Sequence, residues 1–146
     1  MGLKVQVWLI RADAQGSPEA LLLKTTPERG GFWQPVTGSV EPGEDLASAA
    51  ARELHEETGV SIGGADLRAI GHAFEFESRW GGRVREEVFV ATVRDSGRIS
   101  IDSSEHVDFK WVNLRQAETF LEHESTKICL KNVVNFFSRT FSFREN

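Results

Sequence analysis

Three glutamates, Glu53, Glu56 and Glu57, stand within one short segment that has helical character. Positions three and four apart are neighbours on a helix, so the three carboxylates project into one small region. Like charges held this close repel one another unless they spread into solvent or share a cation. Carboxylate oxygens suit a hard divalent ion such as Mg²⁺ or Mn²⁺. The spacing therefore indicates a solvated acidic face or a metal site, and alone it does not choose between them.

The same segment carries an apolar stripe that predicts packing against a sheet. Ala49 falls on the acidic face and leaves room there. We expect Asp45 to cap the start of the helix and Gly59 to end it in the left-handed conformation. The residues on the predicted packing face are Leu46, Ala47, Ala50, Ala51, Leu54 and Thr58.

Gly38, Glu44 and residues 52–60 stand at fixed spacing and read G, five residues, E, seven residues, then RELHEETGV. This pattern resembles the Nudix box, GX5EX7REUXEEXGU with U an aliphatic residue, and no position departs from it. An ordinary amphipathic helix with a solvated acidic face would explain the carboxylates. It would not explain the spacing of the glycine and proline residues before them.

The resemblance implies an α/β fold, a Nudix-type α/β/α sandwich with a mixed sheet between helices. It also implies metal-assisted hydrolysis of a diphosphate bond in a small phosphorylated substrate. Mg²⁺ is the implied cofactor, with Mn²⁺ as a substitute. By position, the resemblance implies Glu56 and Glu57 as principal metal ligands and Glu53 as a further ligand or the water-activating base. The Thr37 carbonyl would be a backbone ligand beside Gly38, at the substrate.

Arg52 stands among acids, and pairing with Glu44 or Glu53 would fix the orientation of their carboxylates, so Arg52 is a catalytic candidate in a supporting role.

Residues 32–44, FWQPVTGSVEPGE, and 105–112, EHVDFKWV, extend the resemblance to the dihydroneopterin triphosphate pyrophosphohydrolase branch. That branch implies Glu105 as a metal ligand or base. It also implies cleavage of dihydroneopterin triphosphate or a dNTP to a monophosphate and pyrophosphate. Two alternatives stay open: a Nudix hydrolase of dinucleoside polyphosphates, ADP-ribose or nucleotide sugars, and a catalytically silent nucleotide sensor. The intact set of acids argues against the sensor.

Three further residues are candidates for contacting substrate. Lys24 ends a predicted strand, where it is either solvated or bound to phosphate. Phe32 and Trp33 are adjacent, and neighbouring side chains of a strand point to opposite faces. One ring can therefore be buried while the other stays available to a flat ligand.

The chain has 146 residues, which predicts a single Nudix hydrolase domain over residues 1–146. Its net charge of −5 argues against a nucleic-acid polymer as partner. No apolar run is long enough to span a membrane. The lone Cys129 predicts a core thiol and fits a reducing cytoplasm. The Nudix resemblance allows a homodimer, but oligomeric state is not readable from the sequence.

Alternating apolar residues predict strands and 3.6-residue periodicity predicts two helices after the acidic one. Phe74, Phe76 and Phe89 are expected in the core. The predicted strands are residues 4–10, 20–24, 67–77, 86–93, 99–101 and 107–112, and the later helices are residues 114–120 and 127–139.

Overall fold

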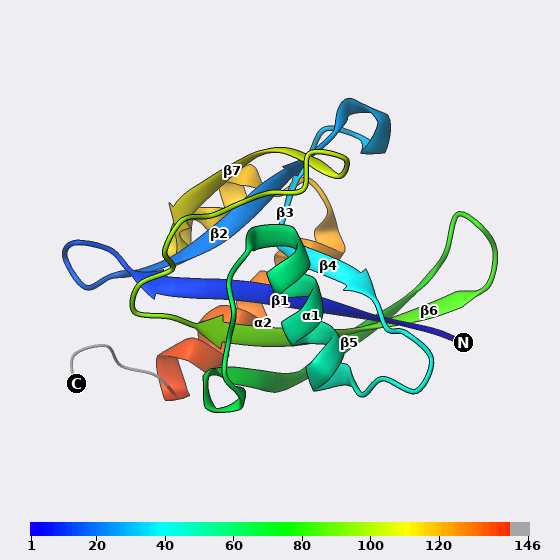
Figure 1. Cartoon of the computed structure of the whole chain (residues 1–146), viewed down its shortest axis with the longest axis horizontal. Helices are drawn as coiled ribbons and strands as arrows, with labels where there is room; N and C mark the ends of the chain where they lie inside the picture. Colours follow the sequence, from blue (N-terminus) through cyan, green and yellow to red (C-terminus); the bar gives the residue numbers. More distant parts are fainter. Residues whose placement is uncertain (141–146) are drawn as a thin grey trace.

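The computed structural model describes residues 1–140, which form a seven-stranded mixed sheet flanked by helices (Figure 1). The main strand order is β3-β2-β1-β6-β5, with β4 also paired to β1 and β7 to β2. Only β1 and β6 run parallel among these pairs. The strands are β1 (Gly2–Ala12), β2 (Pro18–Thr25), β3 (Trp33–Gln34), β4 (Val36–Ser39), β5 (Leu67–Glu77), β6 (Arg83–Thr92) and β7 (His106–Asn113).

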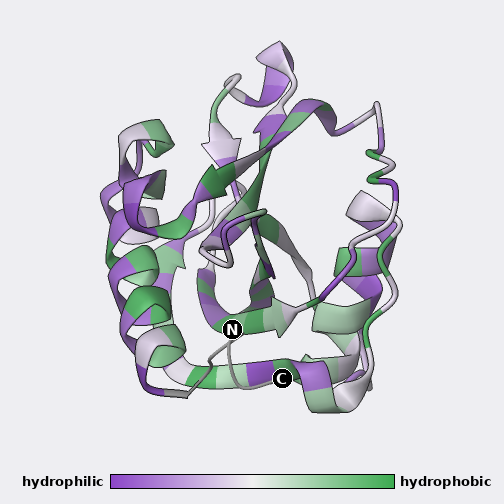
Figure 2. Ribbon diagram, turned by 90° about the vertical axis from the view of Figure 1, so that its left-hand side faces the viewer, coloured by the Kyte–Doolittle hydropathy of each residue, from purple (hydrophilic) through white to green (hydrophobic). Residues whose placement is uncertain are grey.

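Helices cover both faces of the sheet, so the predicted α/β/α sandwich is confirmed (Figure 2). Helix α1 (Leu46–Thr58) packs on the face that carries Val5, Val7 and Leu9 of β1. Helix α2 (Glu124–Thr140) and the 3-10 helix η3 (Leu114–Phe120) pack on the opposite face. Two shorter 3-10 helices, η1 (Pro27–Arg29) and η2 (Gly64–Asp66), lie in loops. Because β1 is central and covered on both sides, its residues 5–10 are all buried.

Both ends of α1 follow the prediction. The Asp45 side chain accepts a hydrogen bond from the Ser48 amide at 2.7 Å. Gly59 ends the helix with φ 80°, and its amide donates to the His55 carbonyl at 2.8 Å. These contacts satisfy backbone groups that a helix terminus would otherwise leave unpaired.

The predicted packing face of α1 was partly wrong. Ala47 is exposed, whereas Ala49 and Glu57, which the helical spacing placed on the acidic face, are buried. The buried stripe is therefore rotated toward the line of residues 49, 53 and 57. On the last turn of α1, Glu57 faces the first residue of β7, His106, whose Nε2 lies 3.9 Å from Glu57 Oε1.

The predicted hairpin is confirmed, with β5 antiparallel to β6 and a turn closed by the Ser78 amide on the Gly82 carbonyl at 2.9 Å. Phe89 is in the core, as expected. Phe74 is partly buried, packs against the core on the α2 side and also lines a cavity. Phe76 is partly buried and lines the same cavity without joining the core, so its assignment to the core was wrong. The side chains of β5 alternate across the sheet, and its inner face meets this cavity where α2 does not cover it.

Residues 99–101 form no strand, which corrects the predicted edge strand. The Ser100 amide donates to the Thr58 carbonyl at 2.8 Å, and Ile99 packs into the core below α1. The segment thus covers the end of a helix rather than extending the sheet. Residues 114–120 are helical as predicted but of the 3-10 type, and α2 begins at Glu124 rather than at 127.

Cys129 is a free, buried thiol, and burial raises its pKa to about 12. Among the helices described, none is long and apolar enough to cross a membrane.

Candidate active site

The acidic centre is built around Glu57, whose side chain is 2% exposed at the end of α1. Its Oε1 atom lies 3.9 Å from Nε2 of buried His106 and has no hydrogen-bond partner within residues 1–140. Burial raises the pKa of Glu57 far above its usual range, and the adjacent carboxylates of Glu53 and Glu105 raise it further. A buried, unpaired carboxylate oxygen next to other acids is a costly arrangement unless a proton or a cation neutralises the charge.

His106 adds no positive charge to this centre. Burial lowers the pKa of its imidazole, and nearby Arg29 lowers it further, so the ring is neutral at pH 7. Its Nε2 atom also lies 3.4 Å from Nε2 of Gln34. The neutral ring therefore does not offset the raised pKa of Glu57, and without a cation Glu57 retains its proton at pH 7.

A divalent cation fits this acidic centre. No group of three acids, histidines or thiols in the described part of the chain forms a ready-made cage. Glu53, however, lies close enough to raise the pKa of Glu57, and the buried Oε1 of Glu57 has no hydrogen-bond partner among the described residues. Mg²⁺ is commonly held by one or two carboxylates, with waters and substrate phosphates completing its shell. Glu57 and Glu53 are the residues that would hold it.

The predicted pairing of Arg52 with Glu44 or Glu53 is confirmed, and Arg52 contacts both. Its Nε donates to Glu44 at 2.8 Å, its Nη1 to Glu53 at 2.9 Å, and its Nη2 to the Ser39 carbonyl at 2.9 Å. These bonds hold the pKa of Arg52 above its usual range and lower the pKa of Glu44 to about 2. The guanidinium thereby ties α1 to the loop after β4 and fixes one oxygen of Glu53.

Unlike Glu53 and Glu57, Glu56 is exposed to solvent. Its side chain is 55% exposed and lies 3.2 Å from Nη1 of Arg52. To act as a ligand next to Glu57, Glu56 would have to turn away from Arg52. Its role as a principal ligand stays a prediction.

Gly38 and Thr37 lie on β4, which passes directly beside the acidic pair. A Cβ atom at Gly38 would overlap the carboxylate of Glu53. Thr37 lines the two cavities described below. The strand thus approaches the acids more closely than a side chain at residue 38 would permit.

Glu105, although 48 positions after Glu57 in the sequence, is brought to the same centre. It immediately precedes β7, which pairs with β2 so that His106 stands opposite Thr25. Its side chain is 34% exposed and forms an ion pair with Arg29 at 3.3 Å. The structure therefore brings Glu105 close to Glu53 and Glu57, from which it is distant in the chain.

Two adjoining cavities lie beside this centre, of about 870 Å³ and about 430 Å³. The larger runs from Arg29 to Trp80 at the tip of the β5–β6 hairpin. Lys4 and Phe32 line both. Phe32 meets His123 edge to face, with ring centroids 4.6 Å apart. The cavities therefore combine cations with an aromatic ring. None of Glu53, Glu56, Glu57 and Glu105 lines them, but Arg29, which lines the larger cavity, forms an ion pair with Glu105.

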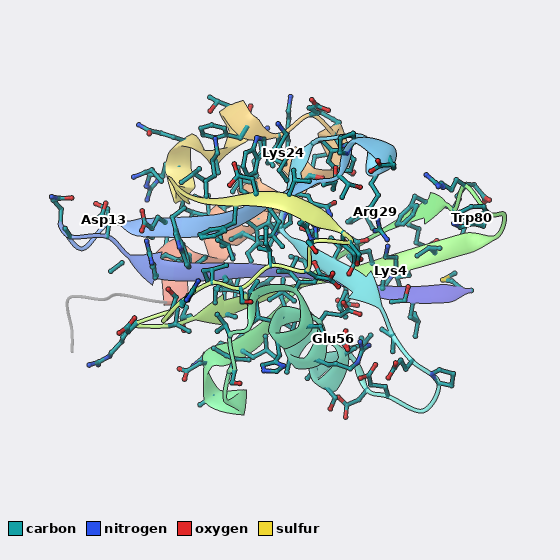
Figure 3. All side chains as sticks on the ribbon, turned by 45° about the horizontal axis from the view of Figure 1, so that its top comes forward. Lys4, Asp13, Lys24, Arg29, Glu56 and Trp80 are labelled. Atoms are coloured by element: carbon teal, nitrogen blue, oxygen red, sulfur yellow. The ribbon has the colours of Figure 1, made fainter. Side chains whose placement is uncertain are left out.

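Trp33 and Lys24 line neither cavity. The Trp33 ring packs on the α2 side of the sheet, where Lys110 Nζ lies 4.4 Å and Lys24 Nζ 5.9 Å from its centre. Lys24 lies well apart from Glu56 (Figure 3). Of the two adjacent rings, Phe32 is thus the one that faces a cavity.

The sequence did not indicate five residues of this region: Lys4, Arg29, Gln34, Glu86 and His106. The neighbouring Glu105 gave a signal for His106, since the two form one motif. Lys4 and Glu86 sit in strands that otherwise read as ordinary, and only the pairing of β1 with β6 places them side by side.

Comparison with known proteins identifies one family model and several relatives with different names. The family model described as "NUDIX domain" matches residues 2–132. The dihydroneopterin triphosphate diphosphatase of Escherichia coli is 26% identical over 135 residues, covering 86% of this chain and 89% of that protein. An octanoyltransferase of Myxococcus xanthus is 44% identical over 103 residues, covering 68% of this chain and 28% of that protein. The chain spans between 28% and 59% of the length of several curated relatives it matches.

Among solved structures, a Caenorhabditis elegans Ap4A hydrolase matches with a TM-score of 0.80 at 24% identity. The match covers 95% of this chain and 99% of that one. At this identity the likeness concerns the fold, and it agrees with the sheet and helices described above.

Proposed function

The chain belongs to the Nudix family of pyrophosphohydrolases, and we propose that it cleaves triphosphates that carry a flat heterocycle, releasing pyrophosphate. One observation carries the proposal: Glu53, the neighbour of Glu57 and its unpaired oxygen, lies against strand β4, and Thr37 of that strand lines a cavity together with Lys4, Arg29 and Phe32. Acids on one side of β4, with a cationic and aromatic cavity next to that strand, suit a metal–polyphosphate bound to a ring.

In the proposed reaction a water molecule attacks the α phosphorus. A new P–O bond forms, the bond from the α phosphorus to the α,β-bridging oxygen breaks, and pyrophosphate leaves. Glu53 accepts a proton from the water. Arg52 holds the Glu53 carboxylate in place by donating a hydrogen bond to its Oε1 atom. A divalent cation, when bound, would neutralise charge that develops on the phosphate oxygens. Lys4 and Arg29 supply further positive charge along the cavity.

The ring of the substrate would lie against Phe32. Stacking on an aromatic side chain contributes about 1 to 3 kcal/mol per base in nucleic-acid sites and tolerates any flat ring. We place dihydroneopterin triphosphate first and dNTPs second. The relative in Escherichia coli that aligns over 86% of this chain supports that order.

Dinucleoside polyphosphates are a second candidate, favoured by the shape of the larger cavity. It has a volume of about 870 Å³ and reaches Arg79 and Trp80 at the hairpin tip, where Trp80 would contact the second ring of such a substrate. Trp80 is 84% exposed, and the Arg79 guanidinium lies 4.8 Å from the centre of its ring. No acyl transfer is proposed, because the match to the octanoyltransferase covers only 28% of that protein.

A competition assay tests the assignment. Dihydroneopterin triphosphate, the four dNTPs, diadenosine tetraphosphate and ADP-ribose are supplied at equal concentration with Mg²⁺, and the phosphorus products are resolved. We expect pyrophosphate and a monophosphate, with the pterin having the highest kcat/KM. A preference for ADP-ribose or diadenosine tetraphosphate would overturn the substrate assignment. Absence of turnover with every compound would favour the silent sensor.

A further inference from the structure

A buried polar chain forms part of the wall of the smaller cavity. Trp8 Nε1 donates to Gln6 Oε1 at 2.6 Å, and Gln6 Nε2 donates to Glu86 Oε2 at 2.8 Å. Trp8 can only donate, so it fixes the orientation of the Gln6 amide and directs its NH₂ group toward Glu86. Gln6 is 2% and Glu86 5% exposed. The carboxylate is therefore held in one position.

The second oxygen of this carboxylate is unused by the protein. Glu86 Oε1 accepts no hydrogen bond from the described residues. It is also not one of the fully buried side-chain atoms that lack a hydrogen-bond partner, so a ligand can reach it. Glu86 lines the cavity of about 430 Å³ together with Phe32 and Phe74. A buried acid with one open oxygen, facing a cavity that contains an aromatic ring, is placed to accept a hydrogen bond from a ligand.

Lys4 complements this acceptor with a donor. Lys4 and Glu86 are partners in the parallel β1–β6 pair, so their side chains project from the same face of the sheet. Lys4 lines both cavities. An acceptor and a cationic donor thus stand next to each other at the end of the cavity where Phe32 would stack a ring.

We propose that Glu86 and Lys4 select a ring with a 2-amino-4-oxo edge, the edge that guanine and pterins share. This inference rests on the proposed function, because it concerns the heterocycle of the same substrate. Such an edge presents an amino N–H, a ring N–H and a carbonyl oxygen in a row. The open oxygen Oε1 of Glu86 accepts from one of the two adjacent N–H groups. Oε2 has a second lone pair beside its bond from Gln6 and accepts from the other, and Lys4 donates to the carbonyl.

The other bases match this arrangement poorly. Adenine and cytosine each place an unprotonated ring nitrogen beside their amino group, and its lone pair would face the carboxylate. Thymine has a single ring N–H between two carbonyl oxygens. Each of these bases leaves a buried polar group without a partner, which is the kind of mismatch that gives strong discrimination.

The test measures ligand preference with and without turnover. Guanosine, neopterin and adenosine are titrated without divalent metal, and tryptophan fluorescence follows binding by wild type, Glu86→Gln and Glu87→Gln. In parallel, kcat/KM is measured with Mg²⁺ for dGTP, dATP and dihydroneopterin triphosphate. Glu86→Gln keeps the size of the side chain. Glu87→Gln is the matched control on the same strand, since its side chain points to the opposite face and pairs with Arg85 at 3.7 Å.

We expect wild type to prefer guanosine and neopterin to adenosine, and Glu86→Gln to reduce that preference by about ten-fold or more, the discrimination of a bidentate contact. Glu87→Gln should leave it unchanged. Retained binding of adenosine, with a similar melting temperature, shows that Glu86→Gln is folded. Equal preferences in wild type and Glu86→Gln would overturn the proposal, whether or not triphosphates are hydrolysed. If the preference is lost in Glu86→Gln but no triphosphate is cleaved, the proposal stands and the proposed hydrolysis falls.

The two sources of the shared edge separate in the same titrations. Tighter binding of neopterin than guanosine assigns the site to pterins, and the reverse assigns it to guanine nucleotides.

Discussion

The carboxylate of Glu53 occupies the space that a side chain at Gly38 would need. The backbone of Gly38 is not in the left-handed region that favours glycine, so conformation does not explain the residue. The explanation is proximity: β4 passes so close to α1 that only a hydrogen atom fits at this Cα. The glycine thereby sets the distance between the strand and the acidic helix.

Gly38→Ala should therefore displace Glu53 without straining the backbone at residue 38. We expect kcat to fall by about 100-fold, since a misplacement of about 1 Å can have this effect. Gly63→Ala is the control, because an added Cβ at Gly63 meets no atom within 4 Å and its φ is not positive. The measurement is kcat and melting temperature for both variants. Equal kcat in the two would show that the position of Glu53 does not matter.

Arg52→Lys tests the orientation of Glu53. A lysine keeps the charge but cannot contact Glu44, Glu53 and the Ser39 carbonyl at once, as the guanidinium does. We expect kcat to fall about 10- to 100-fold, the usual cost of losing a residue that orients a catalytic group. KM should change much less. Unchanged kcat would mean that positive charge alone suffices here.

Glu57→Gln and Glu56→Gln test the dependence on a divalent cation. With Mg²⁺ present, we expect each variant to lose about two orders of magnitude in rate, the scale of a lost electrostatic contact at a reacting centre. Circular dichroism should show an intact fold. Wild-type activity should vanish in EDTA and return with Mg²⁺. Full turnover by both variants in EDTA would exclude the metal-dependent mechanism.

The sequence predicts that Glu53 and Glu57 are neighbours because both lie within one helix. Periodicity determines which side chains of α1 are neighbours, and local chemistry determines its caps at Asp45 and Gly59. The exact rotation of the helix was not predictable, because it depends on His106, a residue of another strand. Glu57 therefore proved buried although spacing alone placed it on an open face.

The ring-binding region shows the opposite case. Nothing in the local sequence distinguishes Phe32 from Trp33, and their separation depends on Lys24 and Lys110 lying beside the Trp33 ring. Likewise, Lys4 and Glu86 become neighbours only through the pairing of two strands distant in the sequence. Such long-range pairing leaves no periodic signal in either segment.

Glu105→Gln tests a residue that only a short motif indicates. If Glu105 assists the metal or the water, the neutral amide of Glu105→Gln cannot supply the negative charge. We then expect kcat to fall and a higher Mg²⁺ concentration to be needed for half-maximal rate. Glu118→Gln on the 3-10 helix η3 is the control. Rate and metal affinity within error of wild type would reduce Glu105 to an ion-pair partner of Arg29.

The final prediction concerns the stability of the metal-free protein. Folding raises the pKa of Glu57 above its ordinary value of 4.5, mainly through burial. Between pH 4.5 and the raised pKa of about 10, the unfolded chain has released a proton that the folded chain retains. The free energy of unfolding therefore decreases as pH rises. The slope for one such group is at most about 1.4 kcal/mol per pH unit. The stabilisation is thus complete below pH 4.5 and is lost progressively above it.

Glu57→Gln has no proton to release, so its stability lacks this component. We expect the melting temperature of wild type in EDTA to fall relative to that of Glu57→Gln between pH 7 and pH 9. This range lies above the titration of His106, whose pKa is lowered by burial from 6.5 and whose contribution is therefore constant there. Saturating Mg²⁺ should flatten the wild-type curve, because a bound cation favours the ionised carboxylate. A constant difference between the two proteins across this range would show that Glu57 ionises normally in the folded chain.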